Sequence, residues 1–398
     1  MTALATHPNI DEMKFVERAR ELAPILAERA QATEDLRCLL PETIADLHQA
    51  GFFRLIQPAK WGGYEVHPNT WFDVVIEVAK GCPSTAWVLG VIGVHNWQLA
   101  LFDPKAQEEV WGNDSTVLIS SSYMPVGKVK RVEGGFEFSG RWGFSSGCDH
   151  CEWAFLGGFV PPEEEGSAPD MRTFLVPRSD YTIDDTWHVS GLKGTGSKDV
   201  VIDKCFVPEY RTHKMSDGFR QKSPGHAINK APLFKLPFGQ VFTRTVGTPA
   251  IGMAAGALDA YCEVTSKRIG RADGVRVNQD PTSSEVAARA ALAIDEVRTT
   301  LHRDYNEMMA SIEAGESMSI PKRAQYRFNS ANATDKCVQA VDDLFTTSGG
   351  GAIFLSNRIN QFWRDIHAAR GHYANNPIKS ARNYGGVMVG LKTTDFFI

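Results

Sequence analysis

Residues 142–150 combine aromatic rings, small hydroxyls, a glycine and a polar run in the one strand-rich part of the chain. Phe144, Ser145 and Ser146 directly precede Gly147, so a ring and two hydroxyl groups stand next to each other. Hydroxyl groups can bond polar ring atoms, and an aromatic side chain packs well against a flat ring. The segment therefore suits contact with a flat aromatic cofactor better than it suits a protein core.

The same segment ends in a C-x-x-C pattern formed by Cys148 and Cys151. A structural zinc site needs four ligands, and no second pair follows at metal-ligand spacing. A thioredoxin-like role needs a βαβ setting, which the surrounding pattern does not provide. We therefore expect two thiols with packing roles and no metal site, and we expect the seven scattered cysteines to be reduced.

Three histidines could take part in proton transfer, because an imidazole has an ordinary pKa of about 6.5. His95 lies in a nearly apolar segment, where a core histidine and a histidine at a binding site fit the pattern about equally well. His367 and His372 flank Arg370 and Gly371 after a helical stretch, which is suggestive only.

A glycine-rich run at residues 191–197 could bind a phosphate through backbone N–H groups, or it could be a plain turn between strands. It is not a P-loop, because no Gly-Lys-Ser/Thr string opens a helix there. The sequence also contains no G-x-S-x-G, no H-E-x-x-H and no dinucleotide-binding G-x-G-x-x-G after a strand.

Composition excludes several classes of protein. The formal net charge is -5 over 398 residues and the basic residues are scattered, which argues against nucleic acid and anionic membranes as partners. Residues 81–102 carry no formal charge, but Pro83 and His95 within them favour a helix buried in a core over a membrane span. The first residues lack a signal-peptide pattern, so we expect a cytoplasmic protein.

The periodicity predicts helices on either side of a strand-rich middle, which is an α+β fold that is mainly α. Expected helices cover residues 15–36, 41–51, 104–111, 246–267, 284–314, 326–347 and 359–369, and a further apolar helix, with Ser84 as its expected cap, carries His95. Expected strands cover residues 116–122, 135–139, 153–160, 172–176 and 200–206, with a loop at 161–166. We expect an N-terminal helical domain (1–114), a middle β-domain (115–213), a linker or lid (214–240) and a C-terminal helical bundle (241–398).

These features together resemble the acyl-CoA dehydrogenase fold, which has an N-terminal helical domain, a middle β-barrel or sandwich and a C-terminal four-helix bundle. In that family an aromatic-x-Ser/Thr strand lies against the flavin, and Phe144 to Ser146 match it. The dehydrogenases also carry a catalytic glutamate near the C-terminus. Here residues 371–377 read Gly-His-Tyr-Ala-Asn-Asn-Pro, without a carboxylate base.

The chain is instead similar to the oxygenase components of two-component flavin-dependent monooxygenases built on this fold. The shared strings are Phe-Ser-Ser-Gly-Cys-Asp-His at 144–150, Ile-Ser-Ser-Ser-Tyr-x-Pro at 119–125, Gly-Val-His-Asn-Trp at 93–97 and Phe-Trp-Arg-Asp-Ile-His-Ala at 362–368. The similarity is greatest to the branch that hydroxylates a phenolic secosteroid in bacterial steroid degradation.

The resemblance implies a reaction and its partners. A separate NAD(P)H:flavin reductase would supply reduced FMN or FAD, and O2 would add at flavin C4a to give a hydroperoxide. An aromatic substrate, expected to be a phenol, would be hydroxylated ortho to its own oxygen. A homotetramer with flavin sites shared between subunits is expected. The alternatives are an oxygenase of indole or another heteroaromatic compound and, in a different class, an acyl-CoA dehydrogenase.

The resemblance also implies roles for named residues. Ser146 is expected to hold the flavin near N5, with Phe144, Ser122, Ser197 and Arg268 as further flavin contacts. His372 is expected to be the base that helps to ionise a phenol whose ordinary pKa is about 10. The expected substrate contacts are His95, Tyr123, Trp97 and Asn376, with His95 also expected to take part in catalysis.

Overall fold

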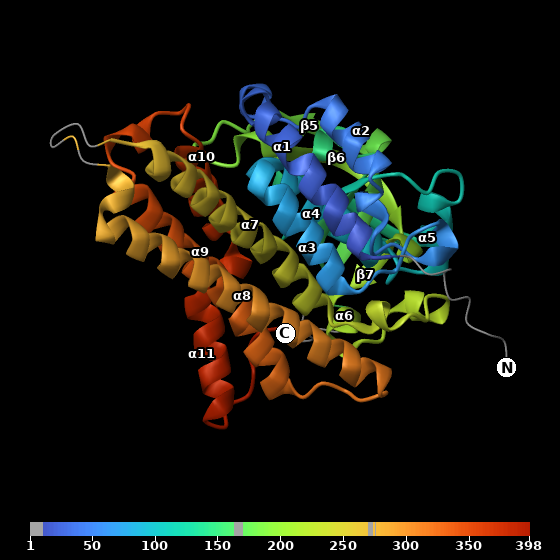
Figure 1. The fold of residues 1–398 in the computed structure, drawn as a ribbon. Helices are drawn as coiled ribbons and strands as arrows, with labels where there is room; N and C mark the ends of the chain where they lie inside the picture. Colours follow the sequence, from blue (N-terminus) through green and yellow to red (C-terminus); the bar gives the residue numbers. More distant parts are fainter. Residues whose placement is uncertain (1–10, 163–169, 270–273, 275) are drawn as a thin grey trace.

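The computed structural model describes residues 11–162, 170–269, 274 and 276–398. Within this part, helices make up both ends of the chain and the long strands lie between them (Figure 1). The predicted loop at 161–166 falls largely outside the described residues.

The N-terminal part consists of α1 (Met13–Leu36), α2 (Pro41–Gln49), α3 (Pro68–Gly81), α4 (Pro83–Leu99) and α5 (Pro104–Trp111). α4 is the predicted buried helix, and every residue in it except Val91 is buried. The expectation that Ser84 caps this helix is wrong. Pro83 begins the helix, because its fixed φ suits the first turn, and the Ser84 hydroxyl has no partner in the described part of the chain.

A seven-stranded sheet forms the middle of the protein, in the order β5-β6-β2-β1-β3-β4-β7. Its strands are β1 (Ile119–Val132), β2 (Gly135–Ser145), β3 (Trp153–Val160), β4 (Asp170–Pro177), β5 (Thr182–Asp184), β6 (Lys198–Pro208) and β7 (Thr212–Lys214). β1 pairs with β3 in parallel, and the other paired strands are antiparallel. The sheet has its own core, built around residues such as Phe138, Trp142 and Phe174.

All five predicted strands are present, but β1 and β2 extend well beyond their predicted bounds. The unpredicted end of β1 is largely solvent-exposed, so it has no alternation of apolar and polar residues to reveal it. The limits given above for the four parts of the chain stay a prediction.

The C-terminal part contains α7 (Phe238–Lys267), α8 (Pro281–Glu313), α9 (Ile320–Thr347), α10 (Arg358–Arg370) and α11 (Pro377–Met388). α9 contacts each of the other four helices. α7 packs against α3 and α4, and α4 also contacts β1, so α4 lies between the sheet and the bundle (Figure 1). Close packing of α7 depends on small residues, since a Cβ at Gly252 would lie 2.2 Å from the carbonyl oxygen of Ile76.

The segment between β7 and α7 contains the short helix α6 (Met215–Arg220) and is hydrogen-bonded to the end of α4. The backbone N–H of Gly225 donates to the carbonyl of Leu101 at 3.0 Å, and Asn229 Nδ2 donates to that of Ala100 at 2.8 Å. The middle of this segment is therefore held against the end of α4. No helix among the described residues has the length and apolarity to cross a bilayer.

Candidate active site

The strand β2 ends in a backbone distortion that separates Phe144 from Ser146. Phe144 has a φ of 63°, a left-handed conformation that is rare outside glycine, and the pairing with β6 shifts register between Trp142 and Ser145. The Phe144 side chain is 68% exposed, while that of Ser146 is buried. A left-handed non-glycine residue costs of order 1–3 kcal/mol, and such strain is concentrated at functional sites.

Ser146 is held by partners from two directions. Trp87 Nε1 on α4 donates to Ser146 Oγ at 3.1 Å, and Ser146 Oγ lies 2.7 Å from Ser197 Oγ. Ser197 Oγ in turn lies 2.7 Å from Thr195 Oγ1, which donates to the carbonyl of Leu192 at 2.9 Å. The predicted flavin contacts Ser146 and Ser197 are thus brought together.

The glycine-rich run at 191–197 is the turn that carries Thr195 and Ser197. Its backbone is fixed from α10, because Asp365 Oδ1 accepts the N–H of Leu192 at 2.6 Å. A Cβ at Gly191 would lie 2.2 Å from the carbonyl oxygen of Arg364, so only glycine allows this approach. Of the two roles considered for this run, the structure shows a turn packed against the bundle.

One face of α4 carries Trp87, Val91, His95 and Gln98, which are spaced three or four residues apart. Val91 is the one residue of α4 that is not buried, and it lies one turn from both Trp87 and His95. Solvent-accessible space therefore adjoins this face between the indole and the imidazole.

His95 is buried, and its Nδ1 lies 2.5 Å from the carbonyl oxygen of Ile119 on β1. A carbonyl oxygen only accepts, so Nδ1 carries the proton and Nε2 bears the lone pair. Nε2 has no hydrogen-bond partner in the described part of the protein. Burial lowers the pKa of His95 to about 4, although the bond to Ile119 opposes this, so the ring is neutral at pH 7.

His372 is half-buried and has the opposite tautomer. Its Nδ1 accepts the backbone N–H of Ala374 at 3.2 Å and caps a short turn, which leaves the proton on Nε2. Burial lowers the pKa of His372 to about 4, and the charge of Arg327 contributes to this. The two neutral histidines therefore present different groups, a lone pair on His95 and an N–H on His372.

Aromatic rings connect the two histidines. His372 packs edge-on against Trp87 at 6.0 Å between ring centroids and lies 6.0 Å from Phe242. Phe242 packs against Tyr123 at 5.2 Å, and Tyr123 lies 6.1 Å from His95. The Tyr123 hydroxyl donates to Gln98, and burial raises its pKa. We refer to Trp87, His372, Phe242, Tyr123 and His95 as the aromatic wall.

Three predicted site residues are not brought to this wall within one chain. Trp97 is fully buried, and its indole N–H donates to the carbonyl of Leu233 at 2.9 Å. Asn376 is exposed and caps α11 through its side-chain oxygen. Arg268 follows the far end of α7, about 39 Å from Phe242 at a helical rise of about 1.5 Å per residue. Ser122 is buried on β1 and is the sequence neighbour of Tyr123.

Sequence reasoning missed Trp87, Thr195 and Phe242. The helical spacing of Trp87, Val91 and His95 is a signal that could have identified Trp87 as a neighbour of the site. Thr195 and Phe242 gave no such signal, because their partners come from distant parts of the sequence.

The C-x-x-C pair has the packing role expected for it. Both thiols are buried, Cys151 lies 3.4 Å from the carbonyl oxygen of Gly147, and Cys148 lies 3.7 Å from that of Gly196. Burial raises the pKa of both thiols. No group of three or more metal-ligating side chains among the described residues could hold a metal ion.

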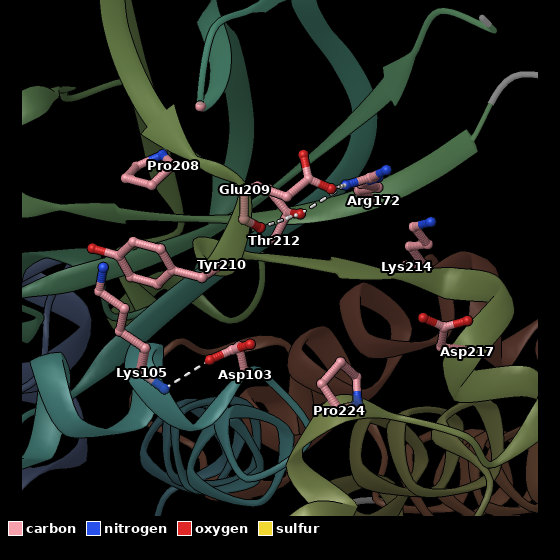
Figure 2. Close-up of a pocket in the computed structure, with 11 residues that line it drawn as sticks. Asp103, Lys105, Arg172, Pro208, Glu209, Tyr210, Thr212, Lys214, Asp217 and Pro224 are labelled. Atoms are coloured by element: carbon pink, nitrogen blue, oxygen red, sulfur yellow. Dashed lines mark hydrogen bonds and ion pairs between the residues drawn. The ribbon is translucent and has the colours of Figure 1, made fainter.

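A separate hollow of about 490 Å³ lies among α5, β4, β7 and α6, and it includes none of the predicted site residues (Figure 2). Its buried Arg172 contacts Asp170 at 2.7 Å, Glu209 and the hydroxyl of Thr212 at 3.0 Å. Lys105 lies over the ring of Tyr210. The central cation is already paired, so we place the chemistry at the aromatic wall and Ser146.

The residues around Ser146 fit a flavin. An isoalloxazine needs an aromatic or apolar surface and hydrogen-bonding groups at its polar edge. Phe144 offers an exposed ring, which packs edge-on against Trp187 at 5.9 Å, and the nearby Ser146 hydroxyl has one hydrogen-bonding site that Trp87 and Ser197 do not use. Ser146 and Phe144 would hold the flavin, and Ser197 would support Ser146 through its hydrogen bond.

Comparison with known proteins places this arrangement in a class. Residues 13–114 match the family described as "Acyl-CoA dehydrogenase, N-terminal domain", and residues 244–377 match "Acyl-CoA dehydrogenase, C-terminal domain". The fold is therefore that of the acyl-CoA dehydrogenases.

Full-length relatives narrow the class. The chain is 42% identical to "Flavin-dependent monooxygenase, oxygenase subunit HsaA" of Rhodococcus jostii (strain RHA1), over 96% of this chain and all of that one. It is 31% identical to "FADH(2)-dependent resorcinol hydroxylase, oxygenase component" of Rhizobium sp. (strain MTP-10005), over 97% and 96% of the two chains. The crystal structure of "3-HSA hydroxylase from Rhodococcus sp. RHA1" superposes with a TM-score of 0.92 at 41% identity, covering 99% of this chain and 100% of that chain. The protein belongs to the family of flavin-dependent monooxygenase oxygenase subunits.

Proposed function

We propose that this oxygenase hydroxylates a phenol ortho to its hydroxyl group, with reduced FMN or FAD and O2 as cosubstrates. The observation that carries the proposal is the position of His95. Its bare Nε2 belongs to a neutral, buried ring on the aromatic wall, which also includes Trp87, and Trp87 bonds Ser146. A phenol beside this wall would meet a hydrogen-bond acceptor at its hydroxyl and aromatic surface at its ring.

The hydrogen bonds of the two histidines support roles that differ from those that the sequence predicts. We assign the phenol proton to His95, because its lone pair is free, whereas the lone pair of His372 is engaged by the N–H of Ala374. His372 then acts as an N–H donor through Nε2. A resting phenol would not lose its proton to His95, since a pKa of about 4 lies far below a phenol pKa of about 10. Transfer becomes favourable as the ring gives up electrons and its hydroxyl becomes much more acidic.

The bound reduced flavin would supply the electrons that activate O2, and one atom of that O2 would be transferred to the ring. The protein's part is to hold the flavin at Ser146 and Phe144, to orient the phenol at His95 and Tyr123, and to exclude water through the apolar surfaces of α4 and α7. Ser122 lies next to Tyr123 in the sequence and is a further candidate contact.

The relative called 3-HSA hydroxylase and the resorcinol hydroxylase suggest the substrate class. We propose a bulky phenol of the secosteroid type as the natural substrate. The sequence around His372 argues against dehydrogenase activity, because residues 371–377 contain no carboxylate to remove an α-proton.

We extend the proposal to the partner protein and to the assembly of the chain. A separate NAD(P)H-dependent reductase would supply the flavin, as for the relative that is named as an oxygenase component. We propose a homotetramer in which Arg268 reaches the flavin of a neighbouring copy, since it lies too far along α7 to serve its own chain. This arrangement is compatible with a cytoplasmic enzyme.

The test is a panel of phenols and indoles, incubated with dithionite-reduced FMN or FAD and then with O2. We expect hydroxylated phenols, with a catechol product from the secosteroid phenol, and little hydrogen peroxide. Quantitative formation of hydrogen peroxide with every phenol, or turnover of indoles alone, would contradict the proposal.

A further inference from the structure

Three buried hydroxyls and one indole N–H form a continuous hydrogen-bonded line at the candidate flavin site. Trp87 Nε1 donates to Ser146 Oγ at 3.1 Å, Ser146 and Ser197 lie 2.7 Å apart, and Ser197 and Thr195 lie 2.7 Å apart. Thr195 Oγ1 ends the line by donating to the carbonyl of Leu192 at 2.9 Å. We call the three hydroxyls of Ser146, Ser197 and Thr195 the hydroxyl relay.

The two ends of the line determine where each proton lies. An indole N–H can only donate and a carbonyl can only accept. With the Thr195 proton on Leu192, Ser197 must donate to Thr195, and Ser146 must donate to Ser197. The Ser146 oxygen then accepts from Trp87 and retains one lone pair, so a ligand atom that meets it must be a hydrogen-bond donor.

The opposite direction is possible at a small cost. If Thr195 donates to Ser197 and Ser197 to Ser146, the Ser146 proton points out to the ligand. The Leu192 carbonyl is not left bare, because it also accepts from Trp187 Nε1 at 3.1 Å and from the N–H of Thr195 at 3.2 Å. Reversal therefore sacrifices one net hydrogen bond, which corresponds to a factor of about five in binding.

We propose that the hydroxyl relay makes this site select reduced over oxidised flavin. The inference rests on the proposed function and on the position next to flavin N5 that the resemblance implies for Ser146. That nitrogen accepts a hydrogen bond in oxidised flavin and carries an N–H in reduced flavin. The relay offers a lone pair in its favoured direction, so the reduced form gains a bond without reversal, whereas the oxidised form requires reversal. Thr195 and Ser197 are thus specificity-determining residues that act through Ser146.

The test compares dissociation constants of oxidised and dithionite-reduced flavin, with FMN and FAD each titrated anaerobically into the intact protein. In Thr195→Val, Ser197 has no acceptor at position 195 and donates to Ser146, whose proton then points outward. We expect the ratio of the oxidised to the reduced dissociation constant to fall by about five-fold or more. In Ser197→Ala the Ser146 proton is also released, and the ratio should fall in the same direction.

Two further variants separate the relay from general damage. Thr195→Ser keeps a hydroxyl at this position and should retain the wild-type ratio. Thr248→Val removes a buried hydroxyl that bonds the carbonyl of Arg244 at 2.7 Å, away from the relay, and should leave the ratio unchanged. An unchanged ratio in both Thr195→Val and Ser197→Ala would overturn the relay, although wild-type flavin binding would still support the proposed function. Failure of the wild-type protein to bind either flavin would instead overturn the proposed function.

Discussion

The carboxylate of Asp365 on α10 accepts the backbone N–H of Leu192 at 2.6 Å and so joins the helical bundle to the turn that carries Thr195. Asp365 is fully buried, and its second oxygen has no partner among the described residues. Burial raises the pKa of this carboxyl to about 7 from an ordinary 3.8. A bond that positions the flavin-side hydroxyls therefore depends on a group that titrates near neutral pH.

Asp365→Asn should change the pH dependence of stability. A raised carboxyl pKa means that the folded protein binds the proton more tightly, so stability falls as pH rises from about 4 to about 7. The full penalty above pH 7 is at most about 4 kcal/mol. The amide keeps an acceptor for Leu192 and does not ionise. The measurement is the melting temperature of both proteins at pH 5 and pH 8. We expect the melting temperature of the variant, relative to that of the wild type, to be higher at pH 8 than at pH 5.

An equal difference in melting temperature at pH 5 and pH 8 would show that Asp365 does not titrate in this range. Asp365→Ala serves as the comparison, because it removes both the charge and the acceptor. It should free the turn and weaken flavin binding at either pH.

Trp87→Phe should uncouple the enzyme. The ring that packs on His372 is kept, but Ser146 loses the indole N–H that holds it at 3.1 Å. We expect a larger share of the reduced flavin to yield hydrogen peroxide instead of hydroxylated product. The measurement is the ratio of product to peroxide after one turnover.

Trp97→Phe is the matched control, because it also removes one buried indole N–H, here bonded to Leu233 at 2.9 Å. Both variants should lose about 1 kcal/mol of stability, the usual net value of a buried hydrogen bond. If both variants uncouple to the same extent, loss of packing explains the effect and Trp87 has no special role.

Local patterns in the sequence predict most of the helices and the five longest strands, since apolar periodicity is a local property, but they do not predict α3 or α11. The resemblance to flavin-dependent oxygenases selects Ser146, His95 and Tyr123, which lie in the described cluster, but it also selects Trp97 and Asn376. The indole of Trp97 bonds Leu233, a contact that leaves no local signature. The side-chain oxygen of Asn376 caps a helix, and Asn before Pro377 is a local signal for such a cap. The tautomers of the two histidines depend on carbonyl and N–H partners that only the folded chain shows.

Arg268 offers a test of sharing between subunits. His95→Ala should lose hydroxylation, and Arg268→Ala should lose flavin affinity. If each flavin is bound by Ser146 of one copy and Arg268 of another, co-assembled mixtures of the two variants contain some sites with both residues intact. Random mixing gives about a quarter of such sites, and we expect activity to be regained to that extent. Mixtures that stay as inactive as the separate variants would place Arg268 outside a shared site.

The two histidines should differ in how their loss depends on pH. Both have a pKa lowered to about 4, so neither titrates between pH 6 and 9 in the wild-type protein. Without the His95 acceptor, only the fraction of phenol that is already ionised can be hydroxylated. His95→Ala should therefore be at least about 100-fold slower at pH 7, and its rate should rise about tenfold per pH unit toward the phenol pKa of about 10.

His372→Ala should lack this slope, because an N–H donor does not compete with solvent ionisation of the phenol. His213→Gln provides a control for the loss of a buried histidine, since burial lowers the pKa of His213 to about 3 and its ring bonds Ser223 at 3.0 Å, away from the aromatic wall. Single-turnover hydroxylation of a phenol between pH 6 and 9.5 separates the possibilities. A steep alkaline recovery in His372→Ala, with a flat profile in His95→Ala, would return the role of base to His372. That result would require the lone pair on Nδ1 to leave the N–H of Ala374 during turnover.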